Sequence, residues 1–204
     1  MEKALKGLQW KILLLYLDDV VVFSTDFDTH LQRLETVFQR LRAAQLKLKP
    51  SKCSLLQTEV KYLGHVVSQH GVSTDPDKTA AIREWKVPTC QTELRTFLGF
   101  VGYYRRFCPE FATIAKPLNR LTAKGATFTW GCEEQEAYEL LRQSMLTALV
   151  LAYPQPDQEF ILDTDASLHG VGAVLSQIQD GQEREISYFS KTLNPAEQNY
   201  CVTR

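Results

Sequence analysis

The order of apolar and polar positions predicts a β-hairpin close to the start of the chain. The segments Ile12–Tyr16 and Val20–Phe23 consist of aliphatic, β-branched and aromatic residues, the composition that strands favour. They are separated by Leu17-Asp18-Asp19, where two adjacent acids break the apolar run. We therefore expect two buried strands that are joined by a tight turn.

A helix and a second hairpin are expected next. Apolar residues follow at the spacing of one helix face: Leu31, Leu34, Val37, Phe38 and Leu41. Thr25 and Asp28 have the spacing of a capping box at the start of this helix, which should end near Ala44. The segment Val60–Val67 then has the pattern of a second hairpin region, with His70-Gly71 as its turn.

The middle of the chain predicts several short helices. Asp75-Pro76 opens a helix that should end near Trp85, and Pro88-Thr89 opens the next one. This second helix carries an apolar stripe with a period of 3.6 residues: Leu94, Phe97, Leu98, Val101, Tyr104 and Phe107. Two further helices are expected over residues 114–121 and 133–146.

Further along, the pattern changes to short strands. The segments with strand character are Phe160–Asp165, Ala173–Gln177 and Glu185–Phe189. Gly170 and Gly172 indicate a turn or bulge between the first two, and Asp180-Gly181 indicates a hairpin turn. A last helix should begin at Pro195.

Composition narrows the class of protein. The chain has 204 residues, of which 44% are hydrophobic and 23% charged, as is typical of globular domains. It has no apolar run long enough to span a membrane and no signal-peptide pattern. The five cysteines are scattered and form no CxxC pair, which predicts free thiols and no zinc site. We expect an intracellular protein, cytoplasmic or nuclear, without a membrane partner.

Charge is distributed unevenly along the chain. Residues 1–124 contain 19 Lys and Arg and 12 Asp and Glu, a net charge of +7, whereas residues 125–204 contain 4 and 12, a net charge of -8. This asymmetry suggests two regions with different tasks, the basic one facing phosphates. Chance scatter of solvated charge explains the same numbers equally well.

The paired acids Asp18 and Asp19 point to metal chemistry. Adjacent residues on a strand point to opposite faces, so only a turn brings both carboxylates near one site. Mg²⁺ prefers hard oxygen ligands and needs only one or two carboxylates when substrate phosphates and water complete its shell. The alternative is a polar turn tip, because Asp is common in turns.

Five groups of motifs, in this order, resemble the Pol polyproteins of Ty3/gypsy-type retroelements. They are Tyr16–Asp19; Leu46–Cys53 with Tyr62–His65; Leu94–Gly99 with Tyr103–Phe107 and Ala115–Leu118; Asp163–Ser167 with Gly172–Gln177; and Ser187–Leu193. The resemblance covers essentially the whole chain. Each motif alone is modest, and their order makes the match specific.

The resemblance implies an α+β fold, with palm hairpins and a helical thumb of a polymerase followed by a truncated RNase H-like α/β domain. The implied parts are the C-terminal part of a reverse transcriptase palm (1–74), a thumb (75–124), a connection (125–156) and the N-terminal part of an RNase H-like domain (157–204). The implied function is RNA-directed DNA polymerase joined to an RNA–DNA hybrid ribonuclease.

The same resemblance implies roles in nucleotidyl transfer. Asp18 and Asp19 would be two of three carboxylates that bind Mg²⁺, while a primer 3′-hydroxyl attacks the α-phosphate of a dNTP. Lys52 matches the position that protonates the leaving pyrophosphate. Its alternative reading is a solvated lysine in a turn.

Contacts with an RNA or DNA template-primer are implied for six residues: Tyr62, Gly64, His65, Tyr103, Arg105 and Arg106. The first three would position the primer terminus, the arginines would reach phosphates and Tyr103 would stack on a sugar or base. The alternatives are a surface histidine of the hairpin for His65, a solvated helix face for the arginines, and a core position for Tyr103.

Asp165 resembles the first catalytic carboxylate of RNase H, where it would hold one of two Mg²⁺ ions and act on an RNA–DNA hybrid. Asp163 lies two residues away and shares its face of the strand, but the match falls on Asp165. The alternative for Asp165 is a cap at the end of a strand.

In this family the third polymerase carboxylate lies upstream of Met1, and the next RNase H carboxylate lies just beyond Arg204. The remainder of the Pol polyprotein is thus an expected partner, and we expect no useful turnover from the 204 residues alone. Two alternatives stay open: a non-catalytic retroelement remnant that binds nucleic acid, and an inert fragment of a decayed element.

Overall fold

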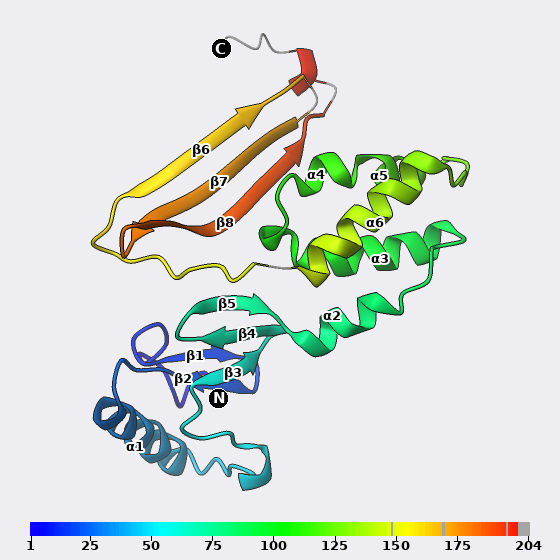
Figure 1. The fold of residues 1–204 in the computed structure, drawn as a ribbon. Helices are drawn as coiled ribbons and strands as arrows, with labels where there is room; N and C mark the ends of the chain where they lie inside the picture. The colour runs from blue at the N-terminus through cyan, green and yellow to red at the C-terminus, as the bar shows by residue number, and fades with distance from the viewer. Residues whose placement is uncertain (148, 169, 195, 200–204) are drawn as a thin grey trace. The chain divides into compact units, whose positions relative to one another are not determined.

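The structure is a computed structural model, and it describes residues 1–147, 149–168, 170–194 and 196–199. The chain divides into two compact units, Met1–Gln57 and Thr58–Arg204. Figure 1 shows the order of the helices and strands.

The first unit contains the expected hairpin and helix. Strands β1 (Leu13–Tyr16) and β2 (Asp19–Val22) pair antiparallel, and α1 (Phe27–Ala43) and the short helix η1 (Pro50–Lys52) follow. The unit has its own small core of fully or almost fully buried side chains: Leu5, Leu13, Val37 and Leu41. Both predicted elements are confirmed.

The predicted cap of α1 is wrong by one residue. Asp26 is the N-cap, and its Oδ1 accepts a hydrogen bond from the Thr29 backbone N–H at 2.8 Å. The Thr25 hydroxyl donates to Asp26 Oδ2 at 3.1 Å instead of capping the helix. A carboxylate at the N-cap satisfies an unpaired amide and also complements the helix dipole.

The second unit begins with a sheet that has one strand more than expected. The turn of its first hairpin is Leu63-Gly64 and not His70-Gly71, because Gly71 already begins the additional strand. Strands β3 (Glu59–Tyr62), β4 (His65–Ser68) and β5 (Gly71–Thr74) pair in that order. The outer edge of β5 bonds to a distant residue, because the Val72 N–H donates to the Leu151 carbonyl at 2.8 Å and the Leu151 N–H donates back at 2.9 Å. Gly71 is required there, since a Cβ would lie 2.2 Å from the Leu151 carbonyl oxygen.

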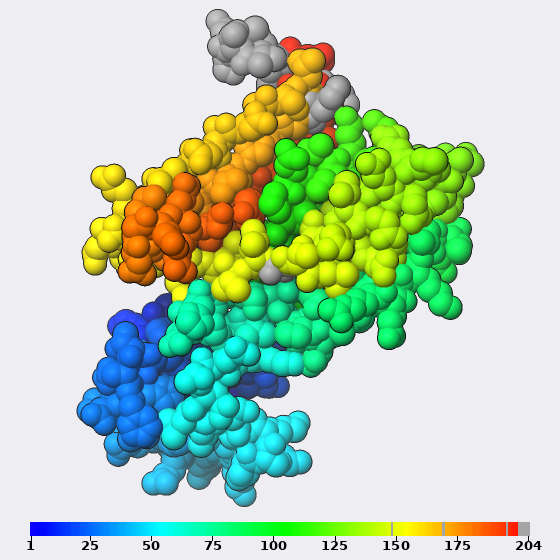
Figure 2. Space-filling view, in the orientation of Figure 1, coloured from blue at the N-terminus to red at the C-terminus, as the bar shows by residue number. Residues whose placement is uncertain are grey.

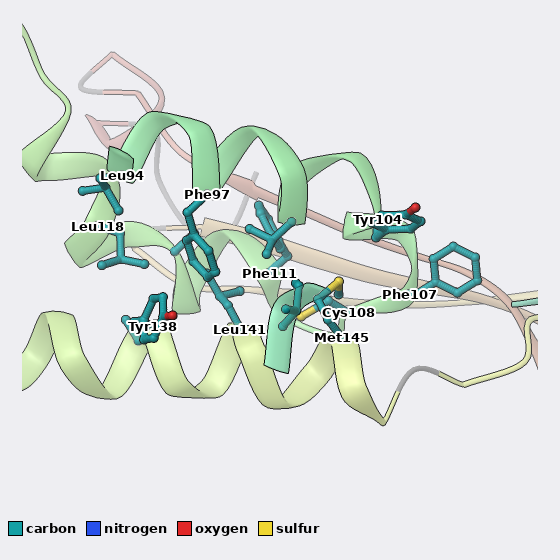
Figure 3. Packing of buried hydrophobic residues seen from close by; sticks show 14 of the residues in the cluster. Leu94, Phe97, Tyr104, Phe107, Cys108, Phe111, Leu118, Tyr138, Leu141 and Met145 are labelled. Atoms are coloured by element: carbon teal, nitrogen blue, oxygen red, sulfur yellow. The ribbon is translucent and has the colours of Figure 1, made fainter. Parts of the chain in front are cut away.

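The helices of the second unit form its main core. They are α2 (Pro76–Arg83), α3 (Gln91–Tyr103), η2 (Arg105–Phe107), α4 (Phe111–Ile114), α5 (Lys116–Leu121) and α6 (Cys132–Leu146). Figure 3 shows Phe97 of α3 pointing at Tyr138 and Leu141 of α6, and the rings of Phe97 and Tyr138 have centroids 4.7 Å apart. The apolar stripe predicted for α3 is the face that packs here.

Most predicted helices in this region are confirmed, with one interruption. The helix expected over residues 114–121 begins earlier, at Phe111, and is broken at Ala115 between α4 and α5. Pro117 explains the break, because proline has no N–H and is tolerated only in the first turn of a helix.

The C-terminal sheet has the strand order β6-β7-β8, with β6 (Phe160–Ala166), β7 (Gly170–Gln179) and β8 (Gln182–Thr192). The predicted Asp180-Gly181 turn is confirmed, with φ angles of 54° and 76°. The short helix η3 (Glu197–Asn199) follows. The predicted start of a helix at Pro195 and the residues from Tyr200 to Arg204 lie outside the described residues.

The two glycines read as a turn or bulge lie inside β7. Gly172 pairs with Asp165, and Gly170 pairs with Thr192. The irregularity in the ladder falls between Leu175 and Ser176 instead. Glycine serves close packing at Gly170, where a Cβ would lie 3.1 Å from the Lys191 carbonyl oxygen.

The C-terminal sheet meets the helices through β8. The Ala112 N–H of α4 donates to Ser190 Oγ at 2.8 Å, and Thr192 Oγ1 donates to the Ala112 carbonyl at 3.3 Å. Strand β6 lies at the opposite edge, where its atoms are at the surface along its length (Figure 2).

The α+β class is therefore confirmed. The division at 74, 124 and 156 stays a prediction. Within the described parts of the chain, every helix is too short or too polar to cross a membrane.

Candidate functional site: a carboxylate hairpin, a turn cluster and a sheet edge

Asp18 and Asp19 lie at the tip of the first hairpin. Tyr16 pairs with Asp19 across the ladder, so Leu17 and Asp18 form a two-residue turn and Asp19 begins β2. Leu17 adopts a left-handed φ of 52°. Both carboxylates are exposed, so the hairpin presents two neighbouring acids to solvent.

This tip suits a hard cation in the type of its donors. Two carboxylates supply the oxygen ligands that Mg²⁺ prefers, leaving further positions for water and phosphate. Within the described residues, no group of three or more His, Cys, Asp or Glu side chains is placed to hold a metal ion. Lys52 ends η1 in the same unit and is exposed.

The second hairpin and the end of α3 bring together four predicted contact residues: Tyr62, Gly64, His65 and Tyr103. Leu63 and Gly64 form the turn between β3 and β4, and His65 follows directly. The Tyr103 hydroxyl donates to the Leu63 carbonyl at 2.6 Å. The rings of His65 and Tyr103 have centroids 5.3 Å apart. Tyr62 is half-buried and pairs with His65.

His65 is held in its neutral form. Its Nδ1 lies 2.8 Å from the Leu63 carbonyl oxygen, so Nδ1 carries the proton. Its Nε2 is buried without a hydrogen-bond partner among the described residues. Burial lowers the pKa of His65 below its usual value, and the nearby positive charge of Arg106 lowers it further, against the opposing effect of the Leu63 carbonyl.

The two predicted phosphate-binding arginines differ in their surroundings. Arg105 donates to the Ser190 carbonyl of β8, and its guanidinium lies 5.7 Å from the Phe111 ring centroid. Arg106 lies over the Phe107 ring, 5.4 Å from its centroid. Arg105 thus joins the helices to the C-terminal sheet, which is a structural task that its sequence position did not indicate.

Asp165 lies apart from these residues, on the exposed strand β6. It pairs with Gly172 of β7, which has no Cβ to cover it. Asp163 lies on the same face of the strand, and both are exposed. The candidate residues therefore fall into three groups: a carboxylate hairpin in the first unit and, in the second unit, an aromatic turn cluster and a carboxylate at a sheet edge.

Family models match both ends of the chain. Residues 1–67 match the family described as reverse transcriptase (RNA-dependent DNA polymerase), and residues 130–204 match the RNase H-like domain found in reverse transcriptase. Both ends of the chain are thus similar to domains of reverse transcriptases.

The relatives of this chain include Pol polyproteins. It is 41% identical over 203 residues to the retrovirus-related Pol polyprotein from transposon 297 of Drosophila melanogaster, covering 99% of this chain and 19% of the relative. It is 35% identical over 204 residues to that from transposon gypsy of the same organism, covering 94% and 19%. The resemblance to Ty3/gypsy-type Pol polyproteins is confirmed. The chain spans about a fifth of the length of these relatives.

Solved structures of foamy viral protease-reverse transcriptase share the fold of this chain. One, in complex with ds DNA, has a TM-score of 0.84 at 26% identity and is matched over 98% of this chain and 35% of its own length. Another, in complex with an RNA/DNA hybrid, has a TM-score of 0.81 at 26% identity, with coverage of 98% and 27%.

Tyr104 and Asp75 are parts of the turn cluster that the sequence analysis missed. Tyr104 was assigned to the apolar stripe of α3, and it is indeed buried, yet its hydroxyl donates to the Gly64 carbonyl at 2.9 Å. The Asp75 N–H donates to the same carbonyl at 3.2 Å. The tyrosine hydroxyl itself could have indicated such a contact, because a buried tyrosine needs a hydrogen-bond partner.

Lys61 supports Asp75 from the neighbouring strand. Its Nζ lies 3.1 Å from Asp75 Oδ1 and also pairs with Asp77. Burial acts to raise the pKa of Asp75, but the Asp77 backbone N–H and the Lys61 ammonium outweigh it, so the pKa lies below its usual value. Asp75 is therefore a charged and paired group beneath the turn.

Proposed function

We propose that this chain is part of an RNA-directed DNA polymerase joined to an RNA–DNA hybrid ribonuclease, within a longer Pol polyprotein. The observation that carries the proposal is the Asp18-Asp19 hairpin tip, because it lies inside the segment that matches the reverse transcriptase family. Two adjacent exposed carboxylates at the tip of a hairpin are suited to phosphoryl chemistry with divalent cations.

Asp18 and Asp19 are the residues that would hold Mg²⁺, which when bound stabilises negative charge on the phosphates of the incoming dNTP. Their exposure leaves them free to take part in a site completed by other parts of the polyprotein. Lys52 Nζ would donate a proton to the leaving pyrophosphate. Its exposed position at the end of η1 leaves the ammonium available for that step.

The turn cluster is proposed to bind the template-primer. Tyr62, Gly64 and His65 would contact the primer terminus, and Tyr103 would offer its exposed ring face. Arg106 would bind phosphates through its positive charge. Arg105, which bonds to β8, would add positive charge to the same surface. The complexes of the foamy viral relatives with ds DNA and with an RNA/DNA hybrid support this class of partner.

Asp165 is proposed as the first carboxylate of the ribonuclease site. It lies on β6 within the segment that matches the RNase H-like family. Its side chain would hold Mg²⁺ together with carboxylates from other parts of the polyprotein. The four-part division into palm, thumb, connection and RNase H-like start, and an intracellular location, belong to the same proposal. Among the described residues, the free thiols Cys53, Cys90, Cys108 and Cys132 suit a reducing compartment.

Primer extension by a Pol polypeptide that contains this chain tests the polymerase assignment. Asp18→Asn should lower extension by roughly 10²–10³-fold, the size of effect that removing one charge-stabilising group produces. Asp28→Asn is the matched control, because Asp28 is an exposed aspartate in the first turn of α1 and should leave extension unchanged. Equal activity of Asp18→Asn and Asp28→Asn would overturn the assignment.

A second candidate function is nucleic-acid binding without turnover by the 204-residue polypeptide itself. It is favoured by the lack of a three-ligand metal group among the described residues and by the net charge of +7 over residues 1–124. The purified polypeptide should bind an RNA/DNA hybrid yet extend no primer. Primer extension by this polypeptide that depends on Asp18 would contradict it.

A further inference from the structure

The turn between β3 and β4 has an unfavourable local conformation. Leu63 and Gly64 both adopt left-handed φ angles, 49° and 72°. Two left-handed residues suit a two-residue hairpin, but the preferred residues are Asn, Asp and Gly, not leucine. Something outside the hairpin should therefore stabilise this turn.

Four hydrogen-bond donors stabilise the turn, and two of them bond to each of its two consecutive carbonyl oxygens. The Leu63 carbonyl accepts from the Tyr103 hydroxyl at 2.6 Å and from His65 Nδ1 at 2.8 Å. The Gly64 carbonyl accepts from the Tyr104 hydroxyl at 2.9 Å and from the Asp75 N–H at 3.2 Å. Each oxygen thus uses both of its lone pairs.

The two tyrosines come from the C-terminal end of α3, forty residues away in sequence. They fit closely against the turn, because a Cβ at Gly64 would lie 2.9 Å from Tyr104 Oη and 3.6 Å from Tyr103 Cε1. Tyr104 is 3% exposed, so its ring is fixed in the helical core, and its hydroxyl points out of that core (Figure 3).

We propose that Tyr103 and Tyr104 are positioning residues, whose hydroxyls fix the Leu63-Gly64 turn to the end of α3. The hairpin that precedes His65 and the helix that precedes Arg106 then present their contacts as one rigid surface to the template-primer. This inference rests on the proposed function for its nucleic-acid partner, but the fixing of the turn is a property of the chain alone.

Hydrogen exchange on the 204-residue chain tests the fixing of the turn without nucleic acid. The double variant Tyr103→Phe/Tyr104→Phe keeps both rings and removes both hydroxyls. Exchange in peptides covering residues 60–75, which include the Asp75 amide, should become roughly three- to tenfold faster, as expected for the loss of hydrogen bonds of ordinary strength.

Tyr138→Phe is the matched control. Tyr138 is also buried, and its hydroxyl also donates to a backbone carbonyl, that of Trp85 at 2.7 Å, but it lies away from the turn. This variant should leave exchange over residues 60–75 as in the wild type. Unchanged exchange in the double variant would overturn the proposal.

Binding of a short labelled RNA/DNA hybrid by the same variants tests the consequence. The double variant should bind roughly three- to tenfold more weakly, the same factor by which the turn is loosened, and Tyr138→Phe should bind as the wild type does. Faster exchange with unaltered affinity would overturn the positioning role. If the wild type binds no hybrid, the proposed function fails, and exchange alone decides whether the hydroxyls hold the turn.

Discussion

The β1–β2 and β3–β4 hairpins have similar turns that are held in different ways. Each turn has two residues and begins with a left-handed leucine, Leu17 with φ of 52° and Leu63 with φ of 49°. Within the first unit, no side chain donates a hydrogen bond to the carbonyls of Leu17 or Asp18. The Leu63-Gly64 turn has four donors on its two carbonyls.

The difference follows the proposed tasks of the two turns. A carboxylate tip that takes up a cation and phosphates must keep its oxygens exposed, so it is supported only by the ladder of its own strands. A surface that fixes a primer end gains from rigidity, because residues that are already ordered lose less conformational entropy on binding. Local backbone geometry alone therefore does not tell which turn is rigid.

The largest expected effect comes from adding one methyl group to the second turn. Gly64→Ala forces a left-handed alanine and places its Cβ against Tyr104 Oη, so it should lower the free energy of unfolding by about 2–4 kcal/mol. Urea unfolding measures this change. Gly181→Ala is the control, since Gly181 has a φ of 76° with nothing within 4 Å, and should cost only about 1 kcal/mol.

A double mutant sharpens this prediction. In a Tyr104→Phe background the atom nearest to the added Cβ is gone, so Gly64→Ala should cost less than in the wild type. Strictly additive effects would show that the Tyr104 hydroxyl and the turn are not coupled.

Acidification should weaken the second hairpin through His65. Its pKa is lowered in the folded state, chiefly by burial, so the unfolded chain takes up the proton first as pH falls. The stability contributed by neutral His65 is thus complete above about pH 6.5 and is lost as pH falls from there through the folded pKa.

Urea unfolding at pH 7.5 and 5.5 measures the contribution of His65. His65→Gln should show a smaller loss on acidification than the wild type, whereas His70→Gln, at an exposed turn position, should behave as the wild type does. An identical loss in the wild type and His65→Gln would contradict the assignment.

The smallest expected effect distinguishes the two leucines. Asparagine tolerates the left-handed region better than leucine. Leu17 is 74% exposed and Leu63 is 37% exposed, so Leu17 gives up less apolar contact. Leu17→Asn should raise the free energy of unfolding by about 0.5–1 kcal/mol, and Leu63→Asn should raise it less or lower it. Thermal unfolding of the two variants gives the comparison, and a larger gain at residue 63 would contradict it.

Local patterns predicted the elements whose signals lie within one segment. The Asp18-Asp19 hairpin, α1, α6 and the Asp180-Gly181 turn followed from apolar spacing and turn residues. Strand β5 was missed although it pairs with the neighbouring strand β4, and its bonds to Leu151 on the other edge join residues far apart in sequence.

The features of the candidate site that could not be predicted from the sequence depend on contacts between residues that are far apart in the chain. The apolar stripe of α3 identified Tyr104 as core but not the carbonyl to which its hydroxyl donates. The sequence predicted a phosphate contact for Arg105. Its hydrogen bond to the Ser190 carbonyl depends on the packing of β8 against the helices, which the sequence does not show. Gly170 and Gly172 were interpreted as a turn or bulge, because the close approach of β8 to Gly170 is not visible in the sequence.

The most direct test is the affinity of the 204-residue chain for an RNA/DNA hybrid, measured by fluorescence anisotropy across a series of NaCl concentrations. We predict an affinity for the hybrid that falls steeply with salt and that is weakened by Gly64→Ala but not by Gly181→Ala. An affinity that does not change with salt, or equal binding by the two glycine variants, would contradict it.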